Sequence, residues 1–111
     1  MRKTVCVDFD GVLNTYDGWQ GEEALFEPRP GASDFLFALF QQGCRVVVFT
    51  TRPADRVWQW LRYYEIDGLV DDITDHKPPA TAYIDDRAIR FDGDFAATLA
   101  EFSGFKAHWE R

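Results

Sequence analysis

The chain has 111 residues, the length of one ordinary domain, and 46% of them are hydrophobic. This apolar fraction is enough to form one buried core, so intrinsic disorder and a disulfide-stapled mini-protein are excluded as classes. The 12 basic and 19 acidic residues give a net charge of −7. Broad binding to nucleic acid or to an anionic membrane is therefore not expected, because phosphate contacts need a basic surface. We expect a single domain over residues 1–111.

Both cysteines lie inside apolar runs. Cys6 is flanked by two valines, and Cys44 stands just before the run Arg45-Val46-Val47-Val48. We interpret them as buried free thiols, which suit a reducing compartment. No apolar run approaches the roughly 18 residues of a membrane span, and the N-terminus enters a strand-like pattern directly. The sequence predicts a cytoplasmic protein without membrane contact.

The first half of the chain alternates between strand-like and helix-like periodicity. A buried strand is predicted at 4–9, and an irregular loop or small hairpin at 11–30. Apolar residues at helical spacing then predict a helix at 32–42, with Gly43 in the position of a C-cap glycine. A second buried strand is predicted at 45–50, followed by a second helix from Pro53 to about Tyr64.

The second half continues the alternation. Short strands are predicted at 68–70 and 82–85. Phe95, Leu99 and Phe102 recur at helical spacing and predict a third helix that ends at Gly104, and the alternation over 105–109 favours a last edge strand. A β-α-β-α-β order with connections of this length predicts a parallel sheet with helices on both faces.

Polar side chains follow three of the predicted strands. Asp8 and Asp10 end the first strand, Thr50 ends the second, and Asp85 and Asp86 end the fourth. Because ligands of parallel sheets bind at the carboxyl ends of the strands, we expect these groups to converge on one sheet edge. Turn formation or helix capping is the alternative role for strand-end acids.

Four carboxylates in one cleft repel one another, and each raises the pKa of its neighbours unless a cation lies among them. Ligand sets made only of oxygen atoms suit a hard divalent ion, and Mg²⁺ commonly binds one or two carboxylates together with water and a substrate phosphate. The sequence therefore predicts a Mg²⁺ site formed by the four acids.

The segment Asp8-Phe9-Asp10-Gly11-Val12-Leu13, together with Thr50, Lys77 and Asp85-Asp86, resembles motifs one to four of the haloacid dehalogenase superfamily. Its members are predominantly magnesium-dependent phosphohydrolases with a Rossmann-like core. The resemblance extends from Val5 to about Phe102. It implies a Rossmann-like three-layer α/β/α sandwich with a mainly parallel sheet.

The resemblance also implies roles for the matching residues. Asp8 would be the nucleophile that becomes an aspartyl phosphate, and Asp10 would act as general acid and then as general base. Thr50 would bind a phosphoryl oxygen, and Lys77 would place a positive charge on the phosphoryl group. The metal ligands would be the Asp8 carboxylate, the Asp10 carbonyl and Asp85, with Asp86 in support.

Several neighbouring residues are candidates for substrate binding. They are Gly11, Thr51 (an alternative to Thr50), Arg52 and Arg87. Trp19 lies in the loop after the nucleophile, where it could stack on a base or sugar, whereas core filling is favoured for Trp58. His76 is interpreted as a solvated loop residue.

The spaces between the motifs bear on the substrate. Residues 11–49 and 52–76 each have room for a helix and its connections but not for a cap domain. An open site suits a bulky substrate, or closure by another subunit in a homo-oligomer. Among capless members, Tyr83-Ile84-Asp85-Asp86-Arg87 is similar to the phosphatase domain of phage polynucleotide kinase and to small bacterial and phage proteins.

Three functional hypotheses remain at this stage. The first is a Mg²⁺-dependent phosphatase acting on a phosphorylated substrate through an aspartyl phosphate. The second is a non-catalytic domain that binds phosphate or metal. The third keeps the enzyme but takes 3′- or 5′-phosphorylated nucleic-acid ends as substrate. The net charge of −7 argues against tight binding to long nucleic-acid polymers.

Overall fold

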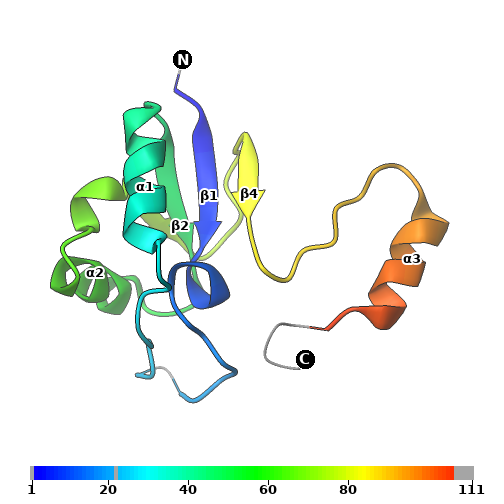
Figure 1. Ribbon diagram of the computed structural model, residues 1–111, viewed down its shortest axis with the longest axis horizontal. Helices are drawn as coiled ribbons and strands as arrows, with labels where there is room; N and C mark the ends of the chain where they lie inside the picture. The colour runs from blue at the N-terminus through cyan, green and yellow to red at the C-terminus, as the bar shows by residue number, and fades with distance from the viewer. Residues whose placement is uncertain (1, 22, 107–111) are drawn as a thin grey trace.

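The computed structural model describes residues 2–21 and 23–106 (Figure 1). β1 is followed by one wide helical turn at Phe9–Leu13, and later by a short helical turn at Asp67–Leu69. The remaining elements alternate between helix and strand. The strands are β1 (Thr4–Asp8), β2 (Arg45–Phe49), β3 (Asp72–Thr74) and β4 (Ala82–Ile84), and the helices are α1 (Ala32–Gln41), α2 (Ala54–Tyr63) and α3 (Phe95–Gly104).

The four strands form one all-parallel sheet in the order β3-β2-β1-β4. β1 is central, and its Val7 lies opposite Val48 of β2 and Ile84 of β4. The C-terminal end of β1 therefore lies between the ends of its two neighbours. A mixed α/β fold with a parallel sheet flanked by helices confirms the predicted fold class and is consistent with Rossmann-like three-layer architecture.

The main hydrophobic core lies on one face of this sheet. Val7 and Val48 are fully buried there, in one cluster with Leu36 of α1 and Leu61 of α2. α1 and α2 thus cover the same face. Gly43, with φ +75°, ends α1 as predicted: its N–H donates to the Phe40 carbonyl at 2.9 Å, a backbone geometry that glycine adopts without strain.

The opposite face of the sheet carries Cys6 of β1 and its register partner Tyr83 of β4. Residues 75–81 return from β3 to β4 across this face without forming a helix, so among the described residues this face lacks the helix that the sequence predicted for it. The Tyr83 hydroxyl donates to the Pro78 carbonyl at 2.6 Å, and the Lys77 ammonium lies 4.3 Å from the centre of the Tyr83 ring. Cys6 and Cys44 are both buried and free, as expected.

The prediction of a strand at 68–70 is wrong. Asp67–Leu69 forms a helical turn, and the strand in this region is β3 at Asp72–Thr74. Val70 is apolar because it enters the core from the turn, not because it belongs to a strand. β3 is an edge strand with a single neighbour, so it can be short and polar.

α3 lies at the end of an extended segment, apart from the sheet (Figure 1). Its first turn is capped by Asp94, whose side chain accepts a hydrogen bond from the Ala97 N–H at 3.0 Å. Phe95, Leu99 and Phe102 share one face as predicted, but all three are exposed. Phe105 is not in a strand, and the rest of the predicted edge strand, residues 107–109, lies outside the described residues. No helix in the described ranges has the length and apolar character needed to cross a membrane.

Candidate metal and phosphoryl-transfer site

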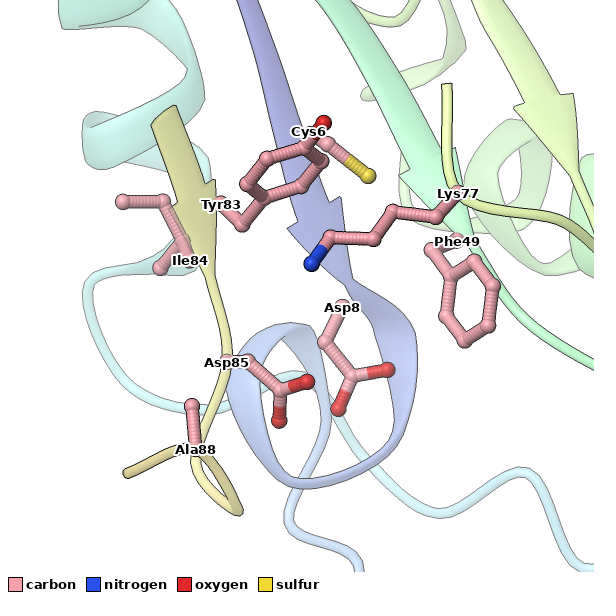
Figure 2. A pocket seen from close by; sticks show the side chains of 8 residues that line it. All are labelled: Cys6, Asp8, Phe49, Lys77, Tyr83, Ile84, Asp85 and Ala88. Atoms are coloured by element: carbon pink, nitrogen blue, oxygen red, sulfur yellow. The ribbon is translucent and has the colours of Figure 1, made fainter. Parts of the chain in front are cut away.

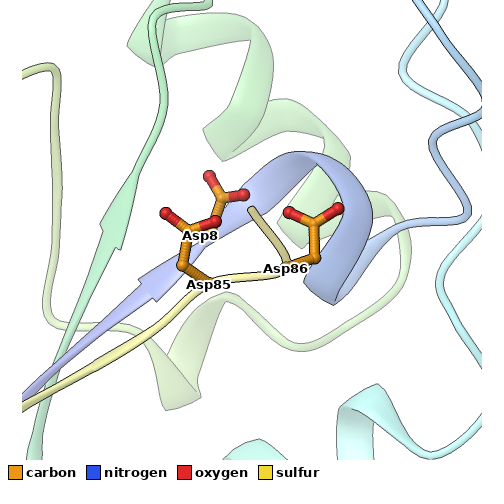
Figure 3. A group of neighbouring side chains, drawn as sticks. All are labelled: Asp8, Asp85 and Asp86. Carbon is orange, nitrogen blue, oxygen red and sulfur yellow. The ribbon is translucent and has the colours of Figure 1, made fainter. Parts of the chain in front are cut away.

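Three carboxylates meet at the end of β1 (Figure 3). Asp8 is the last residue of β1, and Asp85 and Asp86 follow β4 directly. Each offers one oxygen, and these oxygens lie within 4.8 Å of one another. The parallel pairing of β1 with β4 brings the two strand ends together, so three of the four predicted metal-binding acids form a cluster.

The pKa of the Asp8 carboxyl is strongly raised by its surroundings. Its side chain is buried, and Oδ2 receives no hydrogen bond from any described residue. Burial, the charges of Asp85 and Asp86, and a hydrogen bond with Asp86 raise the pKa of Asp8 to about 8, whereas Arg87 lowers it. Without a bound cation, the Asp8 carboxyl keeps its proton near neutral pH. A bound cation would favour the ionised form of Asp8.

A cavity of about 170 Å³ opens beside Asp8 (Figure 2). The Lys77 nitrogen is directed into the same space as the Asp8 and Asp85 carboxylates. Within the described chain, Lys77 forms no ion pair with either acid, so room is left between the charges. The rest of the lining is mostly apolar and consists of Cys6, Phe49, Tyr83, Ile84 and Ala88.

Asp10 lies in a different environment. The Arg52 Nε donates to both of its oxygens, at 2.9 and 3.1 Å, and the Asn14 amide donates to Oδ1 at 2.9 Å. The Arg52 side chain is only 1% exposed. The Asp10 carboxylate is therefore held by residues of its own chain and does not join the cluster of Asp8, Asp85 and Asp86.

Arg52 also fastens the loop that follows the first motif. Its Nη atoms donate to the carbonyls of Gly21 at 3.3 Å and Ala24 at 3.2 Å, and its guanidinium lies 5.1 Å from the centre of the Trp19 ring. In the structure Arg52 is buried and binds Asp10 and the backbone of the loop, whereas the sequence suggested that it binds substrate. Trp19 remains 62% exposed, with a face on Arg52.

Asn14 is a site residue that the sequence analysis missed. It is fully buried, and its Oδ1 accepts hydrogen bonds from the N–H groups of Gly11 at 2.9 Å and Tyr16 at 3.1 Å. Its amide nitrogen donates to Asp10 and to the Leu25 carbonyl. An asparagine that follows Gly11 by three residues is a weak signal, because asparagine is common in turns for purely local reasons.

Gly11 brings the first motif against the fourth. Its φ of +89° belongs to the left-handed region, and a Cβ atom at this position would overlap the Asp86 carboxylate. The close approach of the turn to Asp86 thus requires glycine at this position.

Thr50 and Thr51 occupy the end of β2. Thr50 is buried, its N–H donates to the Thr74 carbonyl at 2.9 Å, and its Oγ1 accepts from the Arg52 N–H at 3.0 Å. Thr51 is exposed. Both line a hollow of about 420 Å³ that also includes His76, whose side chain is 82% exposed as expected.

Arg87 follows the acids of the fourth motif. Its backbone N–H donates to Asp85 Oδ1 at 2.9 Å, which holds that carboxylate next to the C-terminal end of β4.

Two tryptophans of α2 contribute to the core. Trp58 is partly buried against the core, as favoured from the sequence, and Trp60 is buried with its indole N–H donating to the Phe26 carbonyl at 2.9 Å.

Comparison with protein-family models gives no match, and comparison with curated proteins gives none either. Among solved structures, the chain is similar to one described as a conserved protein from Bacteroides thetaiotaomicron. The two share 20% sequence identity over 94% of this chain and 92% of that chain, with a TM-score of 0.62. This similarity supports the α/β fold and, at this identity, assigns no activity.

Proposed function

We propose that the chain is a magnesium-dependent phosphohydrolase of the haloacid dehalogenase type that acts on a phosphomonoester through an aspartyl phosphate. The observation that carries the proposal is the buried Asp8 carboxylate at a strand end, facing Asp85 and Asp86, with Lys77 directed into the same cavity. A site that gathers three acids and directs a lysine into the same cavity is suited to a cation and a phosphoryl group.

The donor set fits Mg²⁺. Asp8, Asp85 and Asp86 would hold the ion through carboxylate oxygens, and Asp8 Oδ2 is a buried oxygen without a hydrogen bond from the described residues. When bound, Mg²⁺ would offset the clustered negative charge and stabilise charge on the phosphoryl oxygens. The Asp10 carbonyl as a further ligand stays a prediction from the family resemblance.

The chemical step uses the chain's own groups. An oxygen of ionised Asp8 attacks phosphorus, and the bond to the leaving oxygen breaks as Asp10, protonated at the start of this step, gives that oxygen its proton and becomes the carboxylate that Arg52 holds. Asp10 then takes a proton from water, whose oxygen attacks the aspartyl phosphate and releases phosphate and Asp8. The hydrogen bonds from Arg52 and Asn14 hold Asp10 in one orientation for both transfers.

Lys77 would bind the phosphoryl group as a point charge, and Thr50 would donate its hydroxyl proton to a phosphoryl oxygen. Lys77 lies on the crossover segment and lines the cavity beside Asp8, whereas Thr50 lies at the end of β2 and lines a separate hollow, so its contact with the phosphoryl group stays a prediction from the family resemblance. Binding from several elements orients the phosphate before the attack.

The test is hydrolysis of an aryl phosphate by the purified chain. We expect turnover with Mg²⁺, loss of turnover with EDTA, and recovery when Mg²⁺ is returned in excess. Asp8→Asn, purified in the same way, is the control for a contaminating phosphatase. A rate that is unchanged by EDTA would overturn the proposal, and Mg²⁺ binding without turnover of any phosphomonoester would favour a non-catalytic binding domain.

A further inference from the structure

α3 carries an apolar ridge that no described residue of its own chain covers. The ridge consists of Phe91, Phe95, Leu99 and Phe102, which are 50%, 81%, 65% and 66% exposed. Phe91 and Phe95 pack on each other with ring centroids 4.9 Å apart, so the ridge continues from the linker into the helix. Four large apolar side chains in one row are more than scattered exposure and mark a contact surface.

The helix also needs a packing partner for its own stability. α3 has ten residues, and isolated helices of this length are marginal in water even with good caps. The Asp94 cap satisfies one N–H at the start of the helix, but it buries no apolar surface. The ridge is therefore the surface through which α3 is stabilised.

One face of the sheet lacks a covering helix among the described residues, just as the apolar ridge of α3 lacks a covering surface. All-parallel sheets are stable with both faces covered, and here α1 and α2 cover the same face. Among the described residues, the 75–81 crossover is all that lies over the other face, and Tyr83 on it is 42% exposed.

We propose that α3 of one copy docks on this second sheet face of another copy, and that two copies exchange their α3 helices reciprocally. In each chain, residues 85–94 run as an extended arm that carries α3 away from its own sheet (Figure 1). A reciprocal exchange has two-fold symmetry, so it closes at a dimer and leaves no free ridge.

The buried area favours exchange over a simple pairing of two α3 helices. A large side chain buries about 150–250 Å² when fully covered, and the four ridge side chains are still about two-thirds exposed, so one ridge offers about 500 Å². Two ridges packed only on each other would bury about 1,000 Å² in total, the lower limit for a specific interface. Two ridges, each on a sheet face, would bury about 2,000 Å², which is the size of a stable interface.

The first experiment measures the mass of the full chain by size-exclusion chromatography with light scattering. We expect a dimer for the parent chain and a monomer for Leu99→Glu, which puts a charge in the middle of the ridge. Phe37→Glu is the matched control, because Phe37 is 48% exposed on the outer side of α1 and lies outside the exchange. A monomeric parent chain, or a dimer broken by Phe37→Glu and not by Leu99→Glu, would overturn the proposal.

The second experiment locates the helix. Tyr83→Cys is placed in a chain with one tag and Leu99→Cys in a chain with another, and the mixed chains are treated with a short bismaleimide. We expect a covalent product that carries both tags, above the background of parent chains with only Cys6 and Cys44. In the double variant Tyr83→Cys, Leu99→Cys, a cross-link confined to one chain would show that α3 folds back on its own sheet and would overturn the exchange.

Discussion

Asp8 and Asp10 lie two residues apart, yet their electrostatic surroundings are opposite. Asp10 receives three hydrogen bonds from Arg52 and Asn14, so a cation of the same chain compensates it. Asp8 faces Asp85 and Asp86, and its pKa rises to about 8. The difference shows that Asp10 is compensated by direct contact with Arg52, whereas on our proposal the cluster around Asp8 takes a metal ion in addition to the nearby Lys77.

The backbone explains how two neighbouring acids reach different surroundings. In a straight strand, residues two apart point to the same face. Asp8 is the last residue of β1, whereas Asp10 lies in the following turn with φ −71° and ψ 122°, just before Gly11 with φ +89°. The chain leaves the sheet between the two aspartates, and the turn carries Asp10 towards Arg52.

The largest expected effect separates the two aspartates by activity. Asp8→Asn should abolish turnover, because an amide cannot form the acyl phosphate. Asp10→Asn should slow turnover by about 10²- to 10⁴-fold, the usual contribution of general acid–base catalysis, and should still form phosphoenzyme. Mass spectrometry of acid-quenched protein locates the phosphoryl group, and phosphate found on Asp10 would reverse the assignment.

The second effect is on stability and concerns the ion pair of Asp10. Arg52→Ala should lower the free energy of unfolding by about 3 kcal/mol, because it leaves Asp10 without its buried partner and frees the loop at Gly21 and Ala24. Urea denaturation measures this change.

Arg56→Ala is the matched control for Arg52→Ala. Arg56 pairs with Glu23 at 4.0 Å, and both side chains are exposed, so its loss should cost less than about 1 kcal/mol. Equal losses of unfolding free energy in the two alanine variants would show that the Arg52–Asp10 pair contributes no more to stability than an ordinary surface ion pair.

Periodicity and strand-end acids made most of this molecule predictable. β1, β2 and β4 are short β-branched or apolar runs, and all three helices have apolar residues at helical spacing. The convergence of Asp8, Asp85 and Asp86 followed from the parallel topology alone. These features are local in sequence or are fixed by strand order, so the sequence contains them.

Other features depend on partners that are distant in sequence. Arg52 meets Asp10 across 42 positions, and nothing near either residue indicates which acid the arginine will choose. β3 was missed because an edge strand needs few apolar residues. The periodicity of α3 predicts a helix, but it contains no information about the surface on which the apolar side should pack.

The third effect compares the contributions of Asp85 and Asp86 to Mg²⁺ binding. Asp85→Ala and Asp86→Ala should both raise the Mg²⁺ concentration needed for half-maximal activity, by about 10- to 100-fold, with the larger effect at Asp85. Asp85 directly follows β4, and its carboxylate lines the cavity with Asp8. Thermal melting without metal accompanies the titration. If Asp85→Ala lowers the metal-free melting temperature and leaves the Mg²⁺ requirement unchanged, Asp85 is a structural cap.

The last effect is a pH dependence of stability that belongs to Asp8. The pKa of Asp8 is raised from 3.8 to about 8 in the folded chain. Below the lower value both states are protonated and the contribution of Asp8 to stability is fully present. As pH rises from there towards 8, the unfolded chain releases this proton while the folded chain keeps it, so metal-free stability should fall and then level off.

Comparison with Asp8→Asn isolates this contribution, because the other titrating groups are present in both proteins. Melting temperatures measured in EDTA across this pH range should converge as pH falls and should increasingly favour Asp8→Asn as pH rises towards 8. Mg²⁺ should reduce the difference, since it favours the ionised carboxylate that burial disfavours. Parallel pH curves for the two proteins in EDTA would mean that Asp8 ionises as easily in the fold as in the unfolded chain, and that the acidic cluster is already compensated without a metal ion.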